Sequence, residues 1–163
     1  MKTIDEMLTE VAKNLNVQSS ITPYNKPVKK DTLDLESAKL LANAAETAAK
    51  SLGLKIVVAV VNSGANLILL HAMDDSYIAS VKASQDKAYT AAALKMPTSQ
   101  ALKESRGGGL DGLTNGNGIL LLAGGEPIFT DGTLAGAIGV SGGTKEQDEL
   151  VAKVAVKIFN SSL

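Results

Sequence analysis

A glycine pair at the start of a helix is the first feature of this sequence that could do chemistry. Residues 136–148 read GAIGVSGGTKEQD, an apolar run followed by two glycines and a helix start. Thr144 can act as the N-cap, and Gln147 stands three residues later, which is the spacing of a capping box. The free N–H groups and the positive dipole end of such a helix can bind an anion. We therefore predict a site for a small polar ligand at Ser141, Gly142, Gly143 and Thr144. The alternative is that the two glycines only turn the chain from strand to helix.

Three charged residues could act on a ligand. Arg106 stands before three glycines, where a guanidinium can bind a carboxylate through two hydrogen bonds; otherwise it is a solvated loop charge. Lys87 lies in a helix of small apolar residues, as a buried functional amine or as a lysine paired with an acid on another element. Glu126 follows Gly125 in a turn and can serve in acid–base chemistry. We predict ligand contacts at Arg106, Gly125 and Glu126, and candidate catalytic groups at Lys87 and Glu126.

The sequence lacks the patterns of several other site types. It has no cysteine, which excludes disulfides, thiol nucleophiles and thiolate metal sites and fits a reducing, cytoplasmic location. There is no His/Glu spacing typical of zinc, no G-x-S-x-G elbow and no phosphate-binding Gly-Lys-Ser/Thr motif. A net charge of -1 gives no general attraction to nucleic acid or to anionic membranes. No apolar run is long enough to span a bilayer.

Periodicity and turn signals predict the elements that position these residues. Helices are expected at residues 3–15, from the N-cap Asp34 to Gly53, at 78–95, from a Thr98 or Ser99 cap to about 104, and from Thr144 to about 159. Strands are expected at residues 55–61, 67–71, 119–122, 128–130 and 134–141. Asp131-Gly132 is a strong hairpin signal, and residues 106–118 are expected to form a glycine-rich loop or lid.

Tight hairpins between strands and the absence of alternating strands and helices favour an α+β fold. We predict a single five-stranded antiparallel sheet flanked by helices. Residues 1–31 are expected to form an N-terminal helix and linker arm, because Pro23, Pro27 and many polar residues follow the first helix. Residues 32–163 are expected to form the main domain. Such an arm cannot bury a core by itself, so it is expected to pack on the main domain or on a neighbouring subunit.

Four segments together resemble the GlcG/HbpS-like family, which includes the C-terminal domain of PduO-type corrinoid adenosyltransferases. They are VVAVVNSGANLILLHAMDD at 57–75, the helix with Lys82, Lys87 and AYTA at 88–91, GGEPI at 124–128, and GAIGVSGGTKEQD at 136–148. The resemblance covers about residues 32–160 and implies a profilin- or PAS-like fold, homo-oligomers and, in some members, haem binding. The chain departs from the usual pattern at Asn62-Ser63-Gly64, where an Asp followed by two glycines is common.

This resemblance implies a small cytoplasmic ligand-binding protein, accessory to haem handling or to glycolate- or diol-type metabolism. The ligand would be haem, a related tetrapyrrole or a small carboxylate metabolite. His71, the only histidine, could be an axial haem ligand, or simply a histidine at the end of a strand. Two alternatives stay open: an enzyme in which Arg106 orients a small hydroxy- or keto-acid while Lys87 or Glu126 moves a proton, and a structural scaffold subunit.

Overall fold

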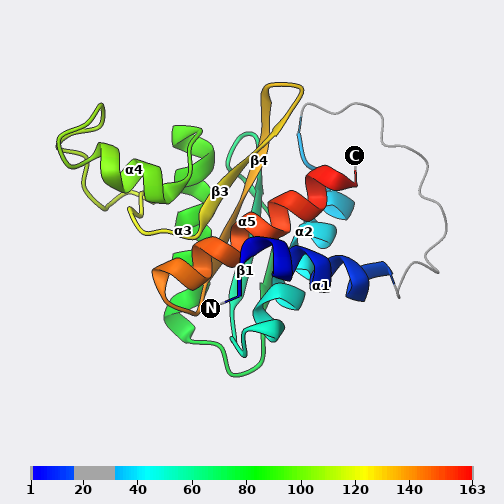
Figure 1. Ribbon diagram of the computed structural model, residues 1–163. Coiled ribbons are helices and arrows are strands. Elements are labelled where there is room, and N and C mark those ends of the chain that lie inside the picture. The colour runs from blue at the N-terminus through cyan, green and yellow to red at the C-terminus, as the bar shows by residue number, and fades with distance from the viewer. Residues whose placement is uncertain (1, 17–31, 163) are drawn as a thin grey trace.

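The computed structural model describes residues 2–16 and 32–162. Within these residues the helices are α1 (Ile4–Asn16), α2 (Leu35–Ser51), α3 (Ile78–Leu94), α4 (Thr98–Glu104) and α5 (Lys145–Ser161). The strands are β1 (Val57–Asn62), β2 (Leu67–Ala72), β3 (Gly125–Thr130) and β4 (Thr133–Ser141), as Figure 1 shows. The linker was predicted at residues 16–31; Asn16 is the last residue of α1, and residues 17–31 lie outside the described residues. No described helix is long and apolar enough to cross a membrane.

The sheet has four strands in the order β2-β1-β4-β3, and all neighbouring strands are antiparallel. The α+β class agrees with the prediction, but the predicted number of five strands was wrong. Residues 119–122 form no strand, and Ile119 makes only an isolated bridge to Gly116. The next two backbone N–H groups donate to side chains instead, that of Leu120 to Thr90 and that of Leu121 to Asn115. This segment therefore has too few free backbone donors to join a ladder.

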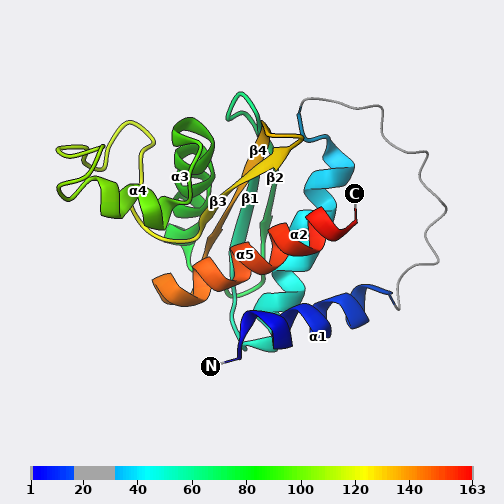
Figure 2. The ribbon, with the colours of Figure 1, turned by 45° about the horizontal axis from the view of Figure 1, so that its top comes forward.

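Helices cover both faces of the sheet (Figure 2). The face packed by α2 and α5 carries Val58, Val60 and Ile138, and α1 adds its buried Met7 and Val11 to the same core. The opposite face is packed by α3 through a smaller, alanine-rich cluster. Because β1 lies between two strands and under helices on both sides, all its residues from 57 to 61 are buried.

Glycines bring α3 unusually close to the sheet. A Cβ atom at Gly139 would lie 2.0 Å from the carbonyl oxygen of Ser84, and one at Gly125 would lie 2.4 Å from that of Lys87. Both carbonyls belong to the backbone of α3, so neither glycine could carry a side chain without moving the helix. Gly125 is therefore buried under α3.

Most of the predicted helix caps and turns are present in the structure. Asp34 caps α2 by accepting a hydrogen bond from Ser37 N, and Thr144 and Gln147 form the predicted capping box of α5. The Asp131-Gly132 turn joins β3 to β4, with positive φ at both positions as a type I′ turn requires. The predicted cap of α4 was wrong, since Pro97 occupies the N-cap position and the side chain of Thr98 is buried against β3.

Candidate functional site

The predicted polar-ligand site at the start of α5 is occupied by the protein's own side chains. Gly143 N donates to Asp148 Oδ1 at 2.8 Å, and Thr144 N donates to Gln147 Oε1 at 2.9 Å. Gly142 has a φ of +153°, and a Cβ atom there would lie 2.4 Å from the carbonyl oxygen of Lys55. A carboxylate of the chain thus takes the place that an anion would take, and the geometry favours a packing role for the two glycines.

Lys87 and Asp148 form a buried ion pair across the fold. Lys87 Nζ donates to Asp148 Oδ2 at 2.7 Å and to the carbonyl oxygen of Val140 at 2.8 Å. The side chain of Lys87 has no exposed surface, and that of Asp148 is 4% exposed. Burial lowers the pKa of Lys87 and raises the pKa of Asp148, and the attraction between the two charges opposes both changes. The pair links α3, β4 and α5, and no ligand can reach the amine in this arrangement.

Glu126 is a buried carboxyl group with an oxygen atom that lacks a hydrogen-bond partner among the described residues. It is 8% exposed, and its Oε1 atom has no hydrogen-bond partner among the described residues. Burial raises the pKa of Glu126 from 4.5 to about 7; Lys153 lowers it and Glu149 raises it. On α5 above it, Glu149 Oε1 accepts hydrogen bonds from Lys153 at 2.5 Å and Ser99 at 2.8 Å. Glu126 can therefore exchange a proton near neutral pH.

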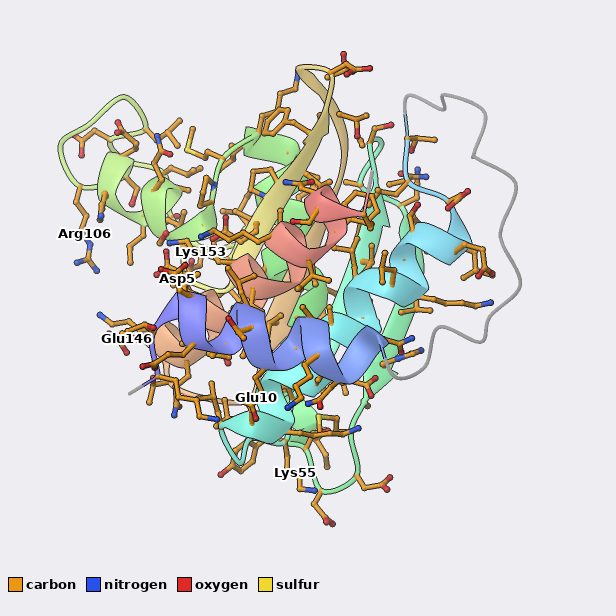
Figure 3. The ribbon with its side chains drawn as sticks, turned by 45° about the vertical axis from the view of Figure 1, so that its right-hand side comes forward. Asp5, Glu10, Lys55, Arg106, Glu146 and Lys153 are labelled. Atoms are coloured by element: carbon orange, nitrogen blue, oxygen red, sulfur yellow. The ribbon has the colours of Figure 1, made fainter. Side chains whose placement is uncertain are left out.

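Arg106 lies apart from the other predicted site residues. It is exposed in the loop that follows α4, and Figure 3 shows its side chain directed away from the body of the molecule. Ser141, in contrast, is buried and donates a hydrogen bond to Ser80 Oγ. The predicted ligand contacts thus fall into an exposed loop, a buried carboxyl group on β3 and the closed start of α5, and the structure does not bring them together around one cavity.

An open groove lies instead between the end of β2 and the end of α2. It has a volume of about 430 Å³ and is lined by residues that include Glu46, Lys50, Lys55, His71 and Met73. This volume falls in the usual range for small-molecule sites, about 300–1,000 Å³. The groove combines an imidazole, two ammonium groups, a thioether and the carboxylates of Glu46 and Asp74, so it offers ligand atoms for a metal ion and cations for a bound carboxylate in one place.

His71 is held in this groove by a carboxylate. Its Nδ1 atom lies 2.7 Å from Glu46 Oε1, and 37% of its side chain is exposed. A carboxylate on one ring nitrogen orients the imidazole and makes the other nitrogen a better metal ligand. Nε2 is thus the ring nitrogen left for a ligand. In the described part of the chain no three His, Cys, Asp or Glu side chains gather into a metal site, so His71 would bind a metal only as part of a larger group.

The sequence predicted His71 as a possible ligand but did not predict Glu46 or the lysines beside it. Glu46 lies 25 positions earlier, on α2, and Lys50 follows it by one helical turn with its Nζ 3.9 Å from Glu46 Oε2. The only signal in the sequence was the pair of opposite charges four residues apart, which is common on exposed helix surfaces. Only the packing of α2 against the sheet shows that this pair faces a histidine.

Comparison with known proteins assigns the chain to a family. Residues 33–157 match the family model described as "Haem degrading protein HbpS-like". An uncharacterized 15.0 kDa protein from the dhaT-dhaS intergenic region of Citrobacter freundii is 39% identical over 139 residues, which are 83% of this chain and 98% of that protein.

Two solved structures are similar over most of the chain. Klebsiella pneumoniae protein ORFY has a TM-score of 0.76 and 35% identity, over 86% of this chain and 99% of that one. The PduOC:heme complex has a TM-score of 0.73 and 29% identity, over 78% of this chain and 94% of that one. The family model covers most of the chain, and this chain belongs to the HbpS-like family.

Proposed function

We propose that this protein binds haem, or a related metal tetrapyrrole, in the groove at His71. The observation that carries the proposal is the Glu46–His71 pair, which orients the only imidazole of the chain at the edge of an open groove. The similarity to a structure described as a haem complex supports the same ligand class. Haem would supply an iron that an imidazole can ligate, and the side chains in the groove would hold the ring.

The residues present in the groove fit such a group. Nε2 of His71 is the nitrogen that would ligate the iron, because Glu46 engages Nδ1. Lys50 and Lys55 line the same groove and supply positive charge for the two propionate carboxylates. Leu70 and Met73 contribute apolar surface for the ring. The groove is open to solvent, so a bound ring would keep part of its surface exposed.

A hemin titration of the purified protein, followed by absorbance, tests this proposal. We expect a saturable Soret shift at a ratio of one hemin to one chain, and loss of that shift in His71→Ala. Glu46→Gln should weaken binding about tenfold or more, because it removes the group that orients the imidazole. Lys39→Ala, an exposed lysine of α2 outside the groove, is the control and should bind as the wild type does. No saturable shift, or an unchanged shift in His71→Ala, would overturn the proposal.

The same cations favour a small carboxylate metabolite as a second candidate ligand. Lys50 and Lys55 can together neutralise one carboxylate and orient it in the groove. Calorimetric titration with glycolate and lactate tests this, and binding that is lost in the double variant Lys50→Ala/Lys55→Ala would support it. Absence of binding heat with both acids would overturn this second candidate.

We further propose that the protein is a cytoplasmic homo-oligomer that takes an accessory part in haem handling or in glycolate- or diol-type metabolism. The absence of cysteine supports the cytoplasmic location. Exposed apolar side chains on α3 support self-association, because exposed residues of this size gathered on one helix mark interaction sites.

A further inference from the structure

Two asparagine–glycine pairs follow one another in the loop that joins α4 to β3, which projects beside α4 (Figure 2). They are Asn115-Gly116 and Asn117-Gly118, and both asparagines are exposed. Asparagine is a thermolabile residue, and a following glycine, which has no side chain, leaves its own nitrogen open to approach. Because the two pairs share this local chemistry, a difference in their reactivity must come from the fold.

The fold protects Asn115 in two ways. Its Oδ1 atom accepts a hydrogen bond from Leu121 N at 2.8 Å, which fixes the side chain. The nitrogen of Gly116 is engaged as well, because it donates to the carbonyl oxygen of Ile119 at 3.0 Å. The two groups that must meet for the side-chain amide to react are therefore both held by other partners.

Asn117 lacks this protection. It has a φ of +52° and Gly118 a φ of +85°, so the two residues form the centre of a tight turn, which hydrogen bonds between Gly116 and Ile119 close. Within the described part of the chain, neither the side chain of Asn117 nor the nitrogen of Gly118 has a hydrogen-bond partner. From this contrast we infer that Asn117 is a site of spontaneous deamidation, with water as the co-reactant.

The reaction has two steps and involves no oxidation or reduction. The nitrogen of Gly118 forms a bond to Asn117 Cγ while the bond from Cγ to Nδ2 breaks, and Nδ2 leaves as ammonia with the proton that the Gly118 nitrogen gives up. One water molecule then opens the resulting succinimide ring. Opening at the side-chain carbonyl gives aspartate, and opening at the backbone carbonyl gives isoaspartate.

The two products differ in their effect because this turn is anchored on α3. A Cβ atom at Gly118 would lie 3.2 Å from the ring of Tyr89, and Leu120 N donates to Thr90 Oγ1 at 2.8 Å. Aspartate keeps the backbone and adds one negative charge. Isoaspartate also inserts a methylene group into the backbone of a two-residue turn, so it should open the turn and loosen its contacts with α3.

Incubation of the folded protein at pH 8, followed by peptide mapping with mass spectrometry, tests this inference. We expect Asn117 to lose its amide nitrogen about tenfold or more faster than Asn115, because reaction at Asn115 must first break two additional hydrogen bonds. Asn115 is the matched control, since a glycine follows it in the same loop. Asn117→Gly, in which glycine accepts the positive φ without strain, should remove the fast phase of ammonia release. Equal rates at the two asparagines, or a fast phase that persists in Asn117→Gly, would overturn the inference.

Unfolding separates the effect of the fold from that of the local sequence. In concentrated urea the two asparagines should react at rates within about twofold of each other, because the hydrogen bonds that protect Asn115 are lost. The same ratio in urea as in the folded protein would overturn the structural cause. Hydrogen exchange at Leu120 N should be faster in the isoaspartate product than in Asn117→Asp, and equal exchange in the two would contradict the opening of the turn.

Discussion

Replacing Glu126 by glutamine should remove an unusual dependence of stability on pH. Glu126 is buried on β3, and its Oε1 atom has no partner in the part of the chain that the structure describes. Burial raises the pKa of Glu126 from 4.5 to about 7. Between these two pH values the folded chain holds a proton that the unfolded chain has released. The stability that comes from this proton is complete below about pH 4.5 and is lost as the pH rises through about 7.

The magnitude follows from the change in pKa. Each pKa unit corresponds to about 1.4 kcal/mol, so ionised Glu126 lowers the free energy of unfolding by about 3 kcal/mol once the pH is above 7. Glutamine resembles the protonated acid and carries no charge, but its amide can leave a buried donor unpaired at a cost of about 1 kcal/mol. We therefore expect Glu126→Gln to be about 2–3 kcal/mol more stable than the wild type at pH 8, and close to it or slightly less stable at pH 4.5.

Urea unfolding followed by circular dichroism, from pH 4.5 to 8.5, measures this difference; the chain has no tryptophan for fluorescence. Lys153→Met gives a second test of the sign. Because Lys153 lowers the pKa of Glu126, its loss should extend the fall in stability of the variant to higher pH. Glu36→Gln, at a carboxyl group 55% exposed on α2, controls for the loss of one negative charge. Parallel pH profiles for the wild type and Glu126→Gln would refute the reasoning.

Two further predictions concern the packing of α3. Lys87→Met should lower the free energy of unfolding by about 3–5 kcal/mol, because it leaves Asp148 charged and buried without its partner. In the same urea assay, the double variant Lys87→Met/Asp148→Leu should recover at least about 1 kcal/mol of that free energy. No recovery would contradict the buried charge as the cause of the loss. Gly139→Ala should lower the free energy of unfolding by about 3 kcal/mol or more, since its Cβ would lie 2.0 Å from the Ser84 carbonyl oxygen. A melting temperature within 2 °C of the wild type would contradict this close approach between β4 and α3.

The elements of this protein were largely readable from the sequence, because their signals act over a few residues. The N-cap at Asp34, the capping box at Thr144 and the Asp131-Gly132 turn depend on hydrogen bonds and dihedral angles within one turn of chain. The β-branched apolar run at residues 57–61 indicated a strand buried on both faces, and the structure confirms this because helices cover both sides of β1. Four segments of the sequence, which lie between residues 57 and 148, also indicated the family.

The number of strands and the partners of the polar side chains were decided by the tertiary structure. Residues 119–122 have strand-like composition, but Thr90, 30 positions before Leu120, takes the backbone donor that a ladder needs. The sequence drew attention to Lys87 and His71 but did not indicate their partners. Asp148, which pairs with Lys87, lies 61 positions away, and Glu46, which contacts His71, lies 25 positions away. Such pairs depend on the register of the sheet and on how helices pack upon it, and these are properties of the whole folded chain that no local pattern encodes.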